Sequence, residues 1–205
     1  MNKPLKFNIK WSPISLLKQL KPYRFALSVV LLSLLVMLFS PFSSDLLRYQ
    51  SNSVSEGQLW RILTANLCHS NWNHWLLNAL GLLIMDYFLK PVVSESLRLK
   101  ILLFTMLGSV LLIHLFLSLN WYVGLSGALH GYLFAGAIIS WQSSKKINAL
   151  ILIIISSKVA IENYWEVNQN TEKLIAANVV EESHLFGVIA GIIFCAGYFL
   201  IKKPH

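Results

Sequence analysis

Six long apolar runs, separated by short polar segments, are the feature of this sequence that most limits what it can fold into. The runs cover about Phe25 to Phe39, Trp72 to Leu89, Leu99 to Leu119, Leu125 to Trp141, Ala149 to Trp165 and His184 to Ile201. Their lengths are near the roughly 20 residues that a helix needs to cross the hydrocarbon layer of a membrane. The composition agrees, because 56% of the residues are hydrophobic and only 13% are charged, unlike soluble proteins. The sequence therefore predicts an all-α integral membrane protein with six transmembrane helices.

The basic residues lie at the ends of the apolar runs and predict the orientation of the chain. Six spans place both termini on one side, and the segments then assigned to the cytoplasm hold thirteen of the 17 lysine and arginine residues. These are Lys3, Lys6, Lys10, Lys18, Lys21, Arg24, Lys90, Arg98, Lys100, Lys145, Lys146, Lys202 and Lys203. The positive-inside rule is satisfied at every loop, so both termini are expected in the cytoplasm. This topology also explains the net charge of +8, and nucleic-acid binding is not expected.

The chain divides into three segments by composition. Residues 1–24 form a basic cytoplasmic N-terminal segment, residues 25–201 the six-helix domain, and residues 202–205 a cytoplasmic tail. The N-terminal segment is long for a signal peptide and no A-x-A site follows it, so the first run is expected to remain as a span. The two cysteines, Cys68 and Cys195, have neither CxxC nor metal-site spacing and are expected to be reduced and buried.

The fourth apolar run begins with the string G-L-S-G-A-L-H-G, residues 124–131, in which Ser126 is a candidate nucleophile. Small residues in membrane helices commonly serve packing, and a single histidine can be a core residue, so neither signal is specific alone. His74 and Asn78, four residues apart on one helix face, lie near the outer end of the second run. His184 opens the sixth run at the same outer side. All these groups share one predicted depth, which favours a common site over separate packing roles.

Glycines on the fourth and sixth runs provide a way to bring Ser126 and His184 together. Gly127 and Gly131 form a GxxxG face, and the sixth run carries H-x-x-G-x-x-x-G beginning at His184. Such faces let membrane helices pack backbone to backbone. His184 can then accept the proton of Ser126 and activate its hydroxyl. Gly124 and Gly127, which flank this serine, are accessory candidates.

The tetrahedral intermediate of acyl transfer needs hydrogen-bond donors for its oxyanion. His74 and Asn78 supply side-chain N–H groups, and the first N–H groups of the fourth helix add theirs. His130, one turn below the serine, is a rival base, although residues four apart on one helix point side by side. No carboxylate is expected to complete a triad, because Asp86 lies near the cytoplasmic side and is expected to pair with Lys90. A Ser-His dyad is therefore the simpler hypothesis.

Other polar residues are accessory candidates with two interpretations each. His69 lies near His74, as a structural or a site residue. Lys158 and Glu162, four apart in the fifth run, form an ion pair or act near substrate entry. Trp60 and Arg61, just before the second run, anchor the outer loop or shape a lid.

Taken in order, these motifs resemble the rhomboid intramembrane serine proteases. The matching elements are G-x-S-G at 124–127, H-x-x-x-N at 74–78, H-x-x-G-x-x-x-G at 184–191 and W-R at 60–61. The resemblance implies a rhomboid-like bundle of six transmembrane helices with Ser126 as nucleophile, His184 as base, and oxyanion donors at His74 and Asn78. It implies no metal or cofactor. It also implies single-span, membrane-anchored protein substrates that are cut near the outer end of their transmembrane segment.

Within this family the chain looks most like the rhombosortases, compact bacterial members with little beyond the six-helix core. The 124–131 string carries this likeness, because many other rhomboids have tyrosine where His130 stands. The resemblance implies removal of C-terminal anchors, a GlyGly motif followed by a transmembrane helix and a basic tail, from surface-bound or secreted proteins. The enzyme would lie in the bacterial inner membrane with its site open to the periplasm. A general rhomboid protease with other substrates, a non-catalytic rhomboid-like binding protein and a small transporter are the alternatives.

Overall fold

The computed structural model describes residues 21–165 and 168–202, so most of the basic N-terminal segment and the end of the tail lie outside the described residues. In these ranges the chain is mostly helical, and its six longest helices each coincide with one of the apolar runs. They are α2 (Arg24–Leu38), α6 (Trp72–Leu89), α7 (Glu95–Phe116), α8 (Ser126–Ile139), α9 (Lys145–Tyr164) and α11 (Glu181–Ile201). Helices α7 and α9 begin four residues before the apolar runs, because polar residues at a membrane boundary can belong to the same helix.

The helices of the described chain carry the surface expected of a membrane protein. Three of them, α7, α9 and α11, are long and apolar enough to cross a bilayer, while α2 and α8 are apolar but shorter. Large apolar side chains are exposed along these helices, including Leu35 and Leu38 on α2 and Ile153 and Ile154 on α9. Exposed apolar area on this scale is unusual for a soluble monomer and is suited to a lipid environment.

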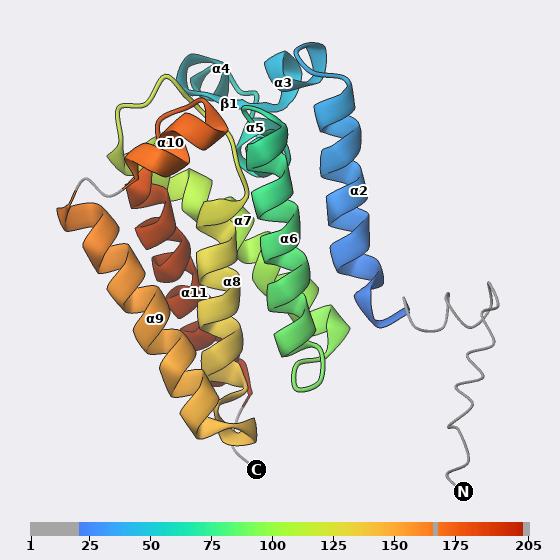
Figure 1. Cartoon of the computed structure of the whole chain (residues 1–205), viewed down its shortest axis with the longest axis vertical. Helices are drawn as coiled ribbons and strands as arrows, with labels where there is room; N and C mark the ends of the chain where they lie inside the picture. Colours follow the sequence, from blue (N-terminus) through green and yellow to red (C-terminus); the bar gives the residue numbers. More distant parts are fainter. Residues whose placement is uncertain (1–20, 166–167, 203–205) are drawn as a thin grey trace, which may run out of the picture.

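Short elements gather at one end of the bundle, the upper end in Figure 1. Between α2 and α6 the chain forms α3 (Phe42–Leu47), β1 (Tyr49–Gln50), α4 (Ser51–Ser55), α5 (Trp60–Thr64) and the 3₁₀ turn η2 (Ala65–Leu67). Strand β1 pairs antiparallel with β2 (Trp121–Tyr122), and α10 (Gln169–Ile175) precedes α11. Two further 3₁₀ turns lie at the opposite end of the bundle, η1 (Lys21–Tyr23) before α2 and η3 (Trp141–Ser143) between α8 and α9 (Figure 1).

Helix α8 is the central helix of the bundle and packs against α6, α7, α9 and α11 (Figure 1). Its contact with α11 is the closest, because glycines face each other along it. A Cβ atom at Gly187 would overlap the carbonyl oxygen of Gly127, and one at Gly131 would overlap the carbonyl oxygen of Gly187. A Cβ at Gly191 would lie 2.7 Å from the oxygen of Gly131. The predicted packing of the two glycine faces is confirmed, and this α8–α11 glycine seam sets the separation of the helices that carry Ser126 and His184.

At the other end of the bundle, Asp86 is fully buried and pairs with a different residue from the one expected. Its Oδ1 accepts from the Tyr132 hydroxyl at 2.9 Å and lies 3.0 Å from Nη1 of Arg98. The expected pair with Lys90 is wrong, because the ammonium of Lys90 donates to the Tyr23 hydroxyl instead. A fully buried carboxylate needs close, desolvated donors, and Arg98 on α7 supplies one.

Both cysteines have the state that the sequence predicts. Cys68 and Cys195 are free and buried. Cys68 lies in the loop before α6 and Cys195 in α11.

Candidate active site

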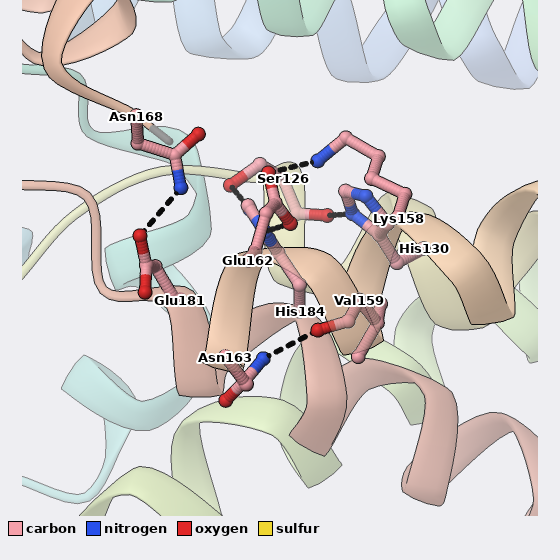
Figure 2. A network of polar contacts seen from close by, with 9 residues as sticks. All are labelled: Ser126, His130, Lys158, Val159, Glu162, Asn163, Asn168, Glu181 and His184. Atoms are coloured by element: carbon pink, nitrogen blue, oxygen red, sulfur yellow. Dashed lines mark hydrogen bonds and ion pairs between the residues drawn. The ribbon is translucent and has the colours of Figure 1, made fainter. Parts of the chain in front are cut away.

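Ser126 and His184 meet where α8 and α11 begin. The Nε2 of His184 lies 3.1 Å from the Oγ of Ser126 (Figure 2). Ser126 is the first residue of α8, so its hydroxyl sits at a helix N-terminus, while His184 is buried in the first turn of α11. The glycine seam directly below these residues brings the two backbones close enough for this contact.

The preceding turn of chain also requires glycine. Gly124 has a φ of +119°, a conformation that only glycine adopts without strain. A Cβ atom there would lie 2.8 Å from both Cε1 and Nε2 of His74. The His74 ring therefore packs against the turn that leads into Ser126, and the residue at 124 is constrained by backbone conformation and by space.

A carboxylate lies beside His184, contrary to the expectation that none would. The Oε2 of Glu162 is 2.8 Å from Nδ1 of His184, and both side chains are buried. The other carboxylate oxygen of Glu162 pairs with the ammonium of Lys158, as the four-residue spacing predicts (Figure 2). The expectation is wrong because the four-residue spacing indicates only a partner on α9, whereas His184 lies on α11. Glu162 lies in the last turns of α9, at the same end of the bundle as Ser126 and His184, and this shared depth was the available signal.

His130 stacks on the ring of His184, and its hydrogen bond goes to the backbone of Ser126. The two rings are stacked, with centroids 4.1 Å apart and planes at 24°. The Nδ1 of His130 lies 2.8 Å from the carbonyl oxygen of Ser126. A carbonyl oxygen only accepts, so this nitrogen carries a hydrogen and donates. His130 is thus held by the backbone of its own helix.

His74 and Asn78 both line the same cavity as Ser126 and His184, a space of about 820 Å³. Asn71 caps α6 by accepting from the backbone N–H of His74 at 2.8 Å, which fixes the first turn of the helix. The amide nitrogen of Asn78 donates to the carbonyl oxygen of His74 at 3.1 Å. The second hydrogen of this amide remains for another acceptor.

Ser70 connects His74 to the chain that covers the cavity. Its hydroxyl donates to the carbonyl oxygen of Ile175 at 2.6 Å and lies 3.0 Å from Nδ1 of His74. The Ser70 amide lies 3.4 Å from the same ring nitrogen. Ile175 ends α10 and lines the cavity. No sequence pattern marks Ser70, because one of its two partners lies 105 residues away and the other, His74, is only four residues away without a helix joining them.

His69 contacts the site through His74. Its ring packs edge-on against that of His74, with centroids 5.0 Å apart at 86°. It is buried, and it braces the neighbouring ring from outside the set of residues that line the cavity.

Trp60 and Arg61 hold the loop before α6. The Nη1 of Arg61 donates to the carbonyl oxygens of Asp45 and Arg48 at 2.9 and 2.8 Å. The indole of Trp60 donates to the carbonyl oxygen of Leu46 at 3.2 Å. These bonds join α5 to α3, which favours the anchoring interpretation for both residues.

One group among the described residues has the composition and spacing of a metal site. The ligand atoms of His130, Glu162 and His184 all lie within 4.8 Å of one another. Each of these residues is already engaged in the network around Ser126, since Glu162 joins His184 to Lys158 and His130 bonds the backbone.

The comparisons with known proteins agree with this architecture at the level of the family. The model of the Rhomboid domain matches residues 56–202, more than two thirds of the chain, and this match includes every site residue from Trp60 to His184. A comparison with curated proteins finds no match. The chain therefore belongs to the rhomboid family, whose members are intramembrane serine proteases that act on membrane protein substrates.

Proposed function

We propose that this chain is an active rhomboid protease that cuts a peptide bond in or beside the transmembrane segment of its substrate. The observation that carries the proposal is the 3.1 Å contact between Ser126 Oγ and His184 Nε2. It occurs beside a cavity of about 820 Å³, within the size range of substrate sites. A non-catalytic relative would have no need of a serine and a histidine in hydrogen-bond contact.

In the proposed reaction, Ser126 is the nucleophile and His184 the general base. The serine hydroxyl donates its proton to Nε2 as Oγ attacks the scissile carbonyl carbon. His184 then returns this proton to the leaving amine as the C–N bond breaks. Water repeats the sequence on the acyl-enzyme and releases the new C-terminus.

The oxyanion would be held by His74, Asn78 and the first N–H groups of α8. The ring of His74 packs on the turn before Ser126, and Asn78 retains an amide hydrogen. The Ser70 amide donates toward Nδ1 of His74, and a ring that accepts at Nδ1 carries its proton on Nε2. Donors pre-aimed at the developing charge are worth about 100-fold to 1000-fold each in known enzymes.

The substrate class that we propose is a single-span membrane protein with a C-terminal GlyGly anchor, as for a rhombosortase. The support is the G-L-S-G-A-L-H-G string with histidine at 130. A substrate helix must unwind to expose its scissile carbonyl, and glycine lowers the free-energy cost of unwinding by about 1 kcal/mol per residue relative to alanine. We further propose six transmembrane spans in residues 25–201, both termini in the bacterial cytoplasm, and a site open to the periplasm without metal or cofactor.

Two experiments test these proposals at separate levels. A fluorophosphonate probe should label the purified protein and should fail to label Ser126→Ala; equal labelling of the two would refute the nucleophile. In cells that make a reporter with a C-terminal GlyGly anchor, mass spectrometry of the reporter should show a trimmed C-terminus only with the unaltered protein. An untrimmed reporter together with normal probe labelling would leave a general rhomboid protease and reject the anchor specificity.

A further inference from the structure

Glu162 is a buried carboxylate that the Ser-His scheme leaves without a role. We propose that it is a positioning residue of the catalytic site, which orients His184 and stabilises its charged form during the reaction. The inference rests on the proposed function, since it assigns a third member to the same site.

The first argument is the hydrogen-bond order along the three residues. His184 can accept the proton of Ser126 only if Nε2 is unprotonated, and a neutral imidazole then carries its hydrogen on Nδ1. That nitrogen faces Oε2 of Glu162 at 2.8 Å. A carboxylate only accepts, so it selects the tautomer that leaves Nε2 free for Ser126.

The second argument is the way in which the carboxylate itself is held. Oε1 of Glu162 pairs with the ammonium of Lys158, one helical turn earlier on α9. The lysine side chain is 45% exposed, whereas that of Glu162 is 6% exposed. Lys158, which also lines the cavity, therefore reaches the carboxylate from the more exposed side and offsets the cost of burying its charge. With one oxygen held by Lys158, the other is directed at His184.

The third argument is that Glu162 and His130 restrict the His184 ring in different ways. Stacking at 4.1 Å restricts the plane of the His184 ring, but it does not distinguish the two ring nitrogens. Of these two contacts, it is the hydrogen bond to Glu162 that distinguishes Nδ1 from Nε2. The carboxylate thus sets the tautomer of His184, which the stacked ring does not.

During the reaction Glu162 keeps its charge and takes no proton. The bond between Ser126 Oγ and the carbonyl carbon forms as the serine proton passes to Nε2 and the π electrons pass to the carbonyl oxygen. The resulting imidazolium lies 2.8 Å from the carboxylate, whose attraction is stronger than in bulk water because both side chains are buried. Collapse of the intermediate breaks the C–N bond, and the Nε2 proton leaves with the amine.

The test compares Glu162→Gln with Glu162→Asp by the kinetics of a fluorophosphonate probe, which needs no known substrate. The probe forms a bond between Ser126 Oγ and phosphorus and releases fluoride, with the serine proton passing to His184. Glu162→Gln should lower the maximal labelling rate at least about 100-fold and change the probe concentration for half-maximal rate by less than about 3-fold, as for amide replacements in known triads. Glu162→Asp should fall between, because a shorter carboxylate still accepts from Nδ1.

The matched control is Glu95→Gln, the same chemical change in an ion pair with Arg24, beside η1 and away from Ser126. It should label at the unaltered rate. An unaltered protein that labels no better than Ser126→Ala would refute the proposed function. An active protein whose Glu162→Gln form labels within about 3-fold of it would instead refute only the role of Glu162. Should the glutamine form not fold, the aspartate form decides, since an unaltered maximal rate contradicts the proposal and a lowered rate at unchanged half-saturation supports it.

Discussion

Replacement of Gly187 by alanine is the sharpest perturbation of the site, because it acts through the separation of two helices. The added Cβ would overlap the carbonyl oxygen of Gly127, whereas ordinary contact begins near 3.4 Å. The backbones of α8 and α11 must therefore part by more than an ångström. The 3.1 Å contact between Ser126 and His184 lies one turn above this point and would lengthen beyond hydrogen-bond range.

The size of the effect follows from this geometry. A displacement of about 1 Å between reacting groups costs on the order of 100-fold in rate. Gly187→Ala should therefore lower probe labelling at least about 100-fold. Gly191→Ala, whose Cβ would lie 2.7 Å from the Gly131 oxygen, needs a shift of only several tenths of an ångström. Gly191→Ala should therefore lower probe labelling less than Gly187→Ala does.

The assay is labelling by a fluorophosphonate in detergent micelles, together with thermal unfolding of each variant. Gly197→Ala is the matched control, since it lies on the same helix with nothing within 4 Å of the added Cβ. It should retain labelling, and alanine should favour the helix by about 1 kcal/mol or less. Wild-type labelling by a folded Gly187→Ala protein would show that the seam does not set the distance between Ser126 and His184.

Three further changes test other parts of the structure. Arg98→Met should lower the free energy of unfolding by about 3 to 5 kcal/mol, because it leaves the buried charge of Asp86 without its partner. Denaturation in micelles should show that Asp86→Asn in the same chain restores most of this stability. If it restores none, the pairing of Asp86 with Arg98 is contradicted. Arg61→Met should lower the free energy of unfolding by about 1 to 3 kcal/mol, because it leaves two carbonyl oxygens without a donor. The folded variant should still be labelled by the probe at the wild-type rate. A folded variant that is not labelled would show that this arginine takes part in the reaction. His130→Tyr should still cleave the GlyGly-anchored reporter, because a tyrosine ring can also stack on His184. Complete loss of cleavage by a folded variant would support His130 as the base in place of His184.

The helices could be predicted from the sequence, because each membrane-crossing helix needs a long apolar run and its ends carry charge. The glycine seam could also be predicted, since a four-residue spacing of glycines marks one face of a helix. The structure of the connection between α2 and α6 could not be predicted in this way. Its short elements are held by bonds such as those of Arg61 to two carbonyl oxygens more than ten residues away, and no local pattern encodes such pairs.

The pairing of charged residues shows where local rules stop. Spacing of four residues favours a pair between Asp86 and Lys90 on one helix, but complete burial of Asp86 selects Arg98 from α7. The same rule correctly joins Lys158 to Glu162, yet it leaves the second carboxylate oxygen unassigned. Which neighbour that oxygen meets depends on the rotation of α9 against α11, and this rotation is set by packing in three dimensions.

The Ser70 hydroxyl has one hydrogen, and in this structure it is donated to Ile175, the last residue of α10. The same oxygen lies 3.0 Å from Nδ1 of His74. If α10 moves away to admit a substrate, this hydrogen is released and can be donated to Nδ1 of His74, where it would reinforce the bond from the Ser70 amide that already favours a proton on Nε2, the side of the oxyanion. Opening of the entrance and readiness of the oxyanion donor would then be linked through one hydrogen atom. Linkage is reciprocal, so an inhibitor that places an anion beside His74 should also favour the open position of α10.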